Sequence, residues 1–98
     1  MAIQVLIKRT IPENKIKEVI PLFRQIRGLA MEQPGYISGA TLKSLDNPNT
    51  YLVISTWNSL AHWKRWFLSK ERQELQDEID SLLEKKTKYE IYNFGFTE

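Results

Sequence analysis

The sequence predicts an α+β fold whose elements follow the order strand, helix, strand, strand, helix, strand. Two periodicities support this prediction: apolar residues recur at every second position in four segments, as in strands, and at every third or fourth position in two others, as in helices. Pro34-Gly35 and the stretch Asp46–Asn49 supply the turn residues between these segments. Because no repeat or linker interrupts the order, we expect a single domain over residues 1–98.

The first strand is predicted over Ala2–Thr10, with Ile3, Val5 and Ile7 on one face. Pro12 then suits the first turn of a helix, where a missing N–H is tolerated. That helix carries an amphipathic stripe made of Ile16, Val19, Ile20, Phe23, Ile26 and Ala30. Pro21 lies inside the stripe, and we expect it to curve the helix over the sheet, in preference to forming a functional hinge.

The two central strands are predicted over Tyr36–Lys43 and Tyr51–Trp57, and apart from the terminal Lys43 both of their faces lack charge. By alternation, one face of the first of these strands carries Tyr36, Ser38, Ala40 and Leu42. Its other face carries Ile37, Gly39 and Thr41. A sheet with one face in water should alternate apolar with polar residues, so two uncharged faces require two covers. Helices supply one cover, and we expect the sheet of a second subunit to supply the other in a homodimer.

The last helical region is predicted to begin at Asn58, to break at Ser69 and to continue with a second apolar face. That face is formed by Leu75, Ile79, Leu82 and Leu83. A final strand is predicted over Lys86–Phe96, and its aromatic residues are too numerous to be left in solvent.

Composition excludes several classes of function. The formal charge of +2, from 14 basic and 12 acidic residues, is spread along the chain, so nucleic acid is not an expected partner. The absence of cysteine excludes disulfides and cysteine-ligated metals, and it suits the cytoplasm. The N-terminal apolar run is too short for a membrane span and lacks the features of a signal peptide, so no membrane association is expected.

The helix after Trp57 contains the candidate site residues. Asn58, His62 and Trp66 share one stripe, and the adjacent stripe is formed by Ser59, Trp63 and Phe67. Each candidate also has an ordinary structural explanation. His62 can be a solvated helix residue, Asn58 can be a helix cap, and Trp66 can belong to the core as Trp63 and Phe67 do.

Three motifs in this part of the chain resemble the antibiotic biosynthesis monooxygenase family. They are the Pro34-Gly35-Tyr36 element with Gly39 and Leu42, the strand ending in Ser55-Thr56-Trp57, and the tryptophan-rich helix that carries Trp63 and Trp66. The resemblance implies a ferredoxin-like βαββαβ antiparallel sheet with helices on one face, assembled as a dimeric α+β barrel. It also implies that the last strand pairs across the dimer.

Some relatives in this family degrade haem, and the resemblance tests that activity residue by residue. Trp66 matches a tryptophan at the ligand cavity of those relatives. Gln76 falls where their iron-ligating histidine is expected, and Ile7 falls near the position of a first-strand asparagine. Because an amide cannot replace imidazole on haem iron, we expect no haem, no metal and no haem-degrading activity.

The resemblance therefore implies the cofactor-free chemistry of the family, in which a small aromatic phenol or quinol reacts directly with oxygen in a dry pocket. The expected catalytic residues are His62 as base and Asn58 as hydrogen-bond donor, with Trp66, Tyr36 and Tyr51 around the substrate. No dinucleotide-binding glycine motif follows any strand. The alternative is a non-catalytic dimeric module that binds a small molecule or serves in stress, and it gains support if His62 and Asn58 both face water.

Overall fold

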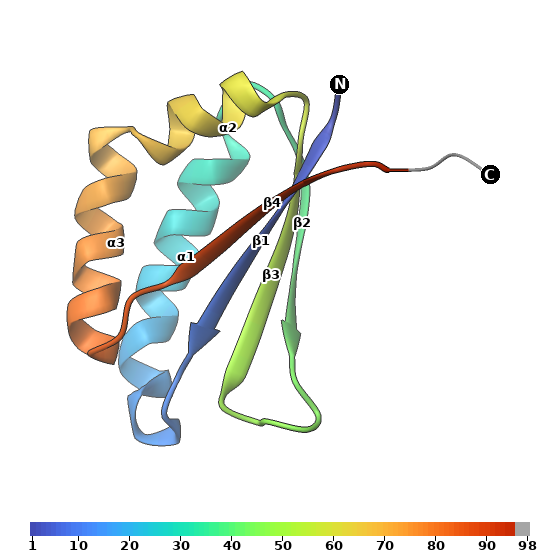
Figure 1. The fold of residues 1–98 in the computed structure, drawn as a ribbon. Coiled ribbons are helices and arrows are strands. Elements are labelled where there is room, and N and C mark those ends of the chain that lie inside the picture. The colour runs from blue at the N-terminus through green and yellow to red at the C-terminus, as the bar shows by residue number, and fades with distance from the viewer. Residues whose placement is uncertain (96–98) are drawn as a thin grey trace.

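The computed structural model describes residues 1–95 as a four-stranded antiparallel sheet with its helices packed on one face (Figure 1). The spatial order of the strands is β2-β3-β1-β4, so the predicted ferredoxin-like βαββαβ fold is confirmed. The elements in chain order are β1 (Ile3–Thr10), the 3-10 helix η1 (Glu13–Lys15), α1 (Ile16–Met31), β2 (Tyr36–Lys43), β3 (Thr50–Trp57), α2 (Leu60–Phe67), α3 (Lys70–Leu83) and β4 (Lys88–Asn93).

Strand β1 lies at the centre of the sheet and pairs with both β3 and β4. Its helix-facing positions alternate with the others as predicted. Ile3 and Val5 are buried on this side, and Arg9 is buried as well. The partners in register with Val5 are Ser55 on β3 and Ile91 on β4. The helix-facing side of the sheet is therefore apolar at one end and carries a guanidinium at the other.

The predicted alternation of β2 is wrong at its beginning. A β-bulge between Tyr36 and Ser38 shifts the register, so Tyr36 pairs with Trp57 and lies on the helix side together with Gly39. The extra residue at the bulge, Ile37, reverses the phase of every position that follows it. Tyr36 therefore shares a face with Gly39 and Thr41, and not with Ala40 as the simple alternation indicated.

The helices begin and end where local chemistry permits. Helix α1 continues through Pro21 without a break. Ser59 caps α2 by accepting the backbone N–H of His62 at 3.2 Å, and Ser69 caps α3 by accepting that of Arg72 at 3.3 Å. The predicted break at Ser69 is confirmed. No helix within residues 1–95 has the length and apolar character needed to cross a membrane.

The core is divided between two clusters on the helix side of the sheet. One cluster surrounds Trp57, which is only 1% exposed, and its other buried members are Ile3, Val5, Trp63 and Trp66. The second lies between α1 and α3 and consists of Ile11, Val19, Ile79 and Leu83. Between these clusters the sheet and helices do not meet completely, and this gap in the packing forms the cavity described below.

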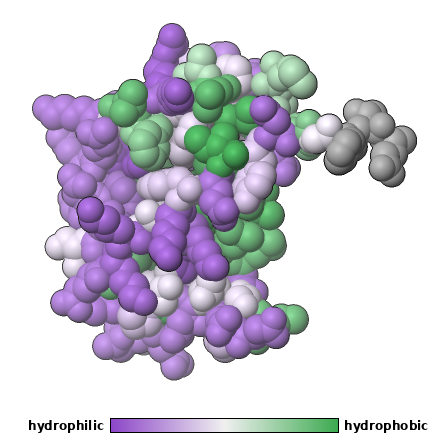
Figure 2. All heavy atoms as spheres, in the orientation of Figure 1, coloured by the Kyte–Doolittle hydropathy of each residue, from purple (hydrophilic) through white to green (hydrophobic). Residues whose placement is uncertain are grey.

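The opposite side of the sheet, here called the open face, has no helix or strand covering it among residues 1–95. Its positions on the two strands β2 and β3 include Ala40, Leu42, Leu52 and Ile54, paired across the strands in register. Apolar atoms gather on the sheet side of the molecule, whereas the helix side is mostly hydrophilic (Figure 2).

Near the end of the chain, Tyr92 and Phe94 are 48% and 58% exposed. Strand β4 ends at Asn93, earlier than predicted, and Phe96 lies outside the described residues.

Candidate functional site

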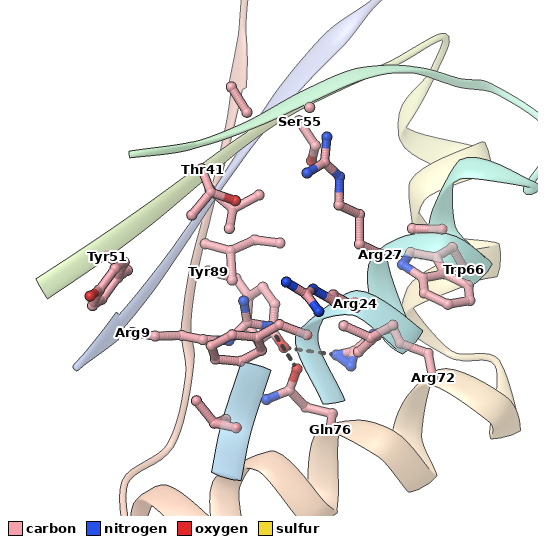
Figure 3. Close-up of a pocket in the computed structure, with 18 of the residues that line it drawn as sticks. Arg9, Arg24, Arg27, Thr41, Tyr51, Ser55, Trp66, Arg72, Gln76 and Tyr89 are labelled. Carbon is pink, nitrogen blue, oxygen red and sulfur yellow. Dashed lines mark hydrogen bonds between the residues drawn. The ribbon is translucent and has the colours of Figure 1, made fainter. Parts of the chain in front are cut away.

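A cavity of about 290 Å³ lies between the helix-facing side of the sheet and the three α-helices (Figure 3). Strands β1 to β4 and helices α1 to α3 all contribute side chains to its lining. The lining is mainly apolar and aromatic, with a small number of polar groups gathered at one end. Small-molecule sites in proteins generally have this composition and about this size.

The aromatic side of the cavity is built by Tyr36, Trp57, Trp63 and Trp66 from β2, β3 and α2. The ring of Trp57 meets that of Tyr36 edge to face at 5.4 Å and that of Trp63 at 5.6 Å. The Trp57 indole also donates a hydrogen bond to Ser55 Oγ at 3.1 Å. These contacts fix the rings in place, so a planar ligand would meet a preformed apolar surface.

The polar end, here called the arginine end, is formed by Arg9 from β1, Arg72 and Gln76 from α3, and Tyr89 from β4. Arg9 Nη2 donates to Gln76 Oε1 at 3.2 Å, and Arg72 Nη2 donates to the Tyr89 hydroxyl at 3.0 Å (Figure 3). Each guanidinium also lies over an aromatic ring, since Arg9 is 4.8 Å from the Phe23 centroid and Arg72 is 5.3 Å from that of Tyr89.

Burial changes the proton affinities at the arginine end. Desolvation lowers the pKa of both arginines, and the nearby Tyr89 and Asp80 oppose that shift. Desolvation also raises the pKa of Tyr89, against the effect of the Arg72 and Arg9 charges. Since an arginine keeps its proton in proteins, this end combines two cations with a neutral phenol that can donate a hydrogen bond.

One carboxylate lies behind the arginine end. Asp80 Oδ1 accepts hydrogen bonds from Gln76 Nε2 at 2.8 Å and from Thr87 Oγ1 at 3.0 Å, and Gln76 in turn accepts from Arg9. Asp80 does not line the cavity. The carboxylate therefore reaches Arg9 through an intervening amide and makes no ion pair with either arginine among residues 1–95.

The cavity opens to solvent between α1 and β2. The exposed lining residues all lie there: Ile20, Arg24 and Arg27 on α1, and Ala40 and Thr41 on β2. Gly39 on β2 leaves room for the Tyr36 side chain, because a Cβ at position 39 would stand 2.6 Å from the Tyr36 hydroxyl. The absence of a side chain at position 39 thus allows the Tyr36 ring to lie against the strand at this point.

The structure places the five site residues predicted from the sequence in two groups. Trp66, Tyr36 and Tyr51 line the cavity, whereas His62 and Asn58 do not. Asn58 is exposed, and its backbone N–H donates to the carbonyl of Gly35 at 2.7 Å. The His62 ring is partly buried against Gly35, and its Nδ1 lies 2.7 Å from Ser59 Oγ. The catalytic roles of His62 and Asn58 stay predictions.

Sequence reasoning missed the arginine end, although two signals for it are present. Arg9 continues the inward alternation of Ile3, Val5 and Ile7 along β1. Arg72 and Gln76 interrupt the buried stripe of α3 that otherwise consists of Leu75, Ile79 and Leu83. A charged residue in phase with a buried stripe indicates either a functional group or a structural polar network.

Metal and haem ligation find little support in this site. Within residues 1–95 no group of three His, Asp or Glu side chains could hold a metal ion. Gln76 stands where an iron-ligating histidine was expected in haem-degrading relatives. Its side-chain amide forms hydrogen bonds with Arg9, Asp80 and Thr87. An amide held in this way does not fit the role of an axial haem ligand.

Comparison with known sequences identifies relatives of the chain. A family model described as antibiotic biosynthesis monooxygenase matches residues 2–78. The protein SchA of Streptomyces halstedii is 27% identical over 73 residues, and the 42.8 kDa protein in the whiE locus of Streptomyces coelicolor is 28% identical over 69 residues. The matches cover 74% and 70% of this chain but only 19% and 17% of those proteins, so the chain spans less than a fifth of their length.

Solved structures share the fold at lower identity. A conserved protein from Methanosarcina mazei superposes with a TM-score of 0.84 at 22% identity, over 94% of this chain and 91% of that chain. A variant of SnoaB, a cofactor-independent oxygenase from Streptomyces nogalater, superposes with a TM-score of 0.83 at 16% identity, over 98% and 95% of the two chains. At these identities the likeness concerns the fold.

Proposed function

The chain belongs to the antibiotic biosynthesis monooxygenase family, and from this premise we propose that it is a cofactor-independent monooxygenase acting on a small aromatic phenol or quinol. The observation that supports the proposal is the cavity, which joins an aromatic surface to a hydrogen-bonding, cationic end. SnoaB, which shares the fold, is a cofactor-independent oxygenase. An electron-rich aromatic ring would fit the apolar part, with its oxygen directed toward Arg72 and Tyr89.

The proposed reaction requires the substrate to supply all four electrons that reduce dioxygen. When the reacting carbon is a methylene group, as in an anthrone, it becomes a carbonyl that keeps one oxygen atom, and the other oxygen leaves as water. The protein contributes orientation, exclusion of water and charge stabilisation. Two buried cations beside a phenol or enol oxygen would lower its pKa and favour the anion that reacts with oxygen.

The lining has no Asp, Glu or His within residues 1–95, so the cavity itself offers no ordinary carboxylate or imidazole base. We propose that the substrate loses its proton to water at the mouth as the arginine field stabilises the anion. Tyr89, whose pKa is raised by burial, would stay neutral and donate a hydrogen bond to the oxyanion. His62 and Asn58 would act as the base and the donor predicted from the sequence only if they moved into the cavity.

We also propose that the functional unit is a homodimer. The open face exposes apolar side chains along β2 and β3, Tyr92 of β4 lies on the same face opposite Gln4, and Phe94 just after β4 is also exposed. A face of this kind is covered in a stable protein, and the matching face of a second copy has the same chemistry. A barrel formed from two such sheets would leave both cavities on its outer, helix-covered sides.

A non-catalytic binding module is the second candidate function. The observation that favours it is that His62 and Asn58, the groups predicted to carry out proton transfer, lie outside the cavity lining. Such a module would use the same cavity and the same dimer without turnover. The two candidates differ in oxygen consumption alone.

An oxygen electrode tests the proposal with a panel of hydroquinones and anthrones. We expect at least one member to consume oxygen faster with the protein than without it, and Trp66→Phe to raise KM because it reshapes the apolar surface. The control is Leu68→Ala, which alters a residue that is 65% exposed and does not line the cavity. Binding of panel members without any oxygen consumption above the protein-free rate would favour the binding module.

A further inference from the structure

The charged residues of the cavity lining all have the same sign. Within residues 1–95 the lining contains Arg9, Arg24, Arg27 and Arg72, and it contains no Asp or Glu. The chain as a whole is almost balanced, with 14 basic and 12 acidic residues. The excess of positive charge in the cavity is therefore a local feature and not a reflection of composition.

Two of these arginines are buried, which is costly for a charged group without a partner. Arg9 and Arg72 are 8% and 5% exposed. Arg9 Nε, Arg72 Nε and Arg72 Nη1 have no hydrogen-bond partner among the described residues. Each guanidinium thus retains donors beyond those used by Gln76 and Tyr89.

The nearby carboxylates do not neutralise this pair. Asp80 is the carboxylate with the largest effect on the pKa of both arginines, and it reaches Arg9 only through Gln76. Asp77 has a smaller effect on the pKa of Arg72, from an exposed position on α3. One half-buried carboxylate beside two guanidinium groups leaves about one positive charge uncompensated at this end of the cavity.

We infer that the cavity takes an aromatic carboxylate, whose carboxylate group lies at the arginine end against Arg9 and Arg72 while its ring lies along Trp63 and Trp66. A carboxylate has the planar, two-oxygen geometry that a guanidinium fork accepts, and charge-assisted hydrogen bonds of this kind are among the strongest in proteins. The inference rests on the proposed function in taking this cavity as the substrate site. It narrows the substrate class to phenols or quinols that carry an acid group beside the hydroxyl, so that the carboxylate and the phenol oxygen both reach the arginine end.

The mouth of the cavity agrees with an anionic ligand. Arg24 and Arg27 lie one helical turn apart on α1, where their exposed side chains line the opening. Positive charge at the entrance of an apolar cavity attracts anions and increases their rate of entry. These two arginines would guide the carboxylate inward without being part of its final binding site.

The competing explanation is that Arg9 and Arg72 are structural. Their stacking on Phe23, Phe67 and Tyr89 would then be their whole role. Calorimetric titration of the wild-type protein separates the two explanations with naphthoate and naphthamide, which have the same shape and differ in charge. We expect naphthoate to bind at least about tenfold more tightly and to raise the melting temperature. Equal affinities would overturn the inference.

Substitutions locate the carboxylate. Arg72→Met keeps the length of the side chain and should weaken naphthoate binding roughly tenfold or more while changing naphthamide binding little. Arg72→Lys keeps the charge and should restore part of the affinity. Arg65→Met is the matched control, because Arg65 is exposed and does not line the cavity. Unchanged naphthoate binding in a folded Arg72→Met protein would contradict the proposed position; if that variant does not fold, the wild-type ligand pair decides alone.

Oxygen consumption with gentisate and gentisamide distinguishes this inference from the proposed function. These hydroquinones again differ only in the acid group, and we expect gentisate to have the lower KM. Selective naphthoate binding with no oxygen consumption from either hydroquinone would support the carboxylate site and reject the oxygenase. Equal turnover of gentisate and gentisamide, together with no preference for naphthoate, would support the oxygenase and reject the carboxylate site.

Discussion

The two faces of the sheet are built from the same strands but differ in what covers them. On the helix side, Trp57 and Val5 are buried to 1% and 0% exposure, and the remaining space is the cavity with its arginine end. On the open face, no helix or strand of the described part of the chain covers the register partners Leu42 and Leu52, and Leu42 is 49% exposed. The helix side thus contains the cavity, whereas the open face carries an apolar strip along β2 and β3 with polar residues such as Gln4 and Thr56 beside it.

This difference separates recognition from assembly. A substitution on the helix side should change stability or ligand binding, because that face is completed within one chain. A substitution on the open face should change association, because its partner is proposed to be another copy. Substitutions on each face therefore test whether recognition and assembly are separate.

Trp57→Ala should have the largest effect on stability. Trp57 joins Tyr36 and Trp63 through edge-to-face contacts and donates to Ser55 Oγ. Truncation of a buried aromatic residue should lower the free energy of unfolding by about 3–5 kcal/mol. Urea denaturation measures this change, and Leu45→Ala is the control because Leu45 is 98% exposed. A loss below about 1 kcal/mol would mean that the helix side is not organised around Trp57.

Ile54→Lys should change association and leave the chain folded. Ile54 lies on the open face, opposite Leu6 and Ala40 in the register. An unpaired charge enclosed between two sheets should raise the dimer dissociation constant by roughly 100-fold or more. Sedimentation compares this variant with Gln73→Lys, which adds the same charge to an exposed position on α3. A wild-type chain that sediments as a folded 11.6 kDa monomer at micromolar concentration would reject the homodimer.

Tyr89→Phe should have a moderate effect, because it leaves the Arg72 Nη2 donor without its hydroxyl partner. We expect the free energy of unfolding to fall by about 1–3 kcal/mol at neutral pH, measured by urea denaturation. Tyr92→Phe is the control, since Tyr92 is exposed and hydrogen-bonds only to Glu90 among the described residues. A Tyr89→Phe protein as stable as the wild type would show that the hydroxyl does not compensate Arg72.

The same substitution has a pH signature. Burial raises the pKa of Tyr89 from its usual 10.0, so the folded state holds the phenol proton more tightly than the unfolded chain. This contribution to stability is complete below pH 10 and is lost as pH rises through the folded pKa. Stability above pH 10 should therefore fall more steeply in the wild type than in Tyr89→Phe. Arg9 and Arg72, whose pKa values burial lowers, act in the opposite sense in both proteins.

His62→Ala should have the smallest effect on ligand binding and oxygen consumption. The His62 ring contacts Gly35 and Ser59 and does not line the cavity, so we expect a rate within about twofold of the wild type. The oxygen electrode and the panel used for Trp66→Phe provide the measurement. A loss of roughly 100-fold would restore the general-base role predicted from the sequence and show that His62 reaches the substrate.

The fold was predictable because its signals are local and periodic. The alternation of Ile3, Val5 and Ile7 and the helical stripes give each element its buried face, and the turn residues separate the elements. The bulge after Tyr36 was not predictable, because no proline or charge marks the extra residue and its effect depends on pairing with Trp57. Element ends were less accurate than element types, as the shorter β4 shows.

The site was predictable in its aromatic part and not in its polar part. Tyr36, Tyr51 and Trp66 were chosen from neighbouring motifs, and all three line the cavity. The arginine end assembles Arg9 and Arg72, which are 63 positions apart in the numbering, with β4, so it exists only after the sheet and α3 pack together. A histidine is a common catalytic residue and is therefore a natural candidate in any sequence, whereas an arginine on a half-apolar helix is usually a surface residue.

A substitution at Gly39 would change the shape of the cavity. A methyl group at this position would stand too close to the Tyr36 hydroxyl and would move the ring, because the neighbouring atom is the end of a side chain and not backbone. A single Gly39→Ala substitution could therefore alter the space beside the aromatic side while leaving the strand pairing and the arginine end in place. A substitution at this one position would change the size of the ligand that the cavity accepts without changing the charge that it prefers. Related chains could therefore take different substrates while keeping the same fold.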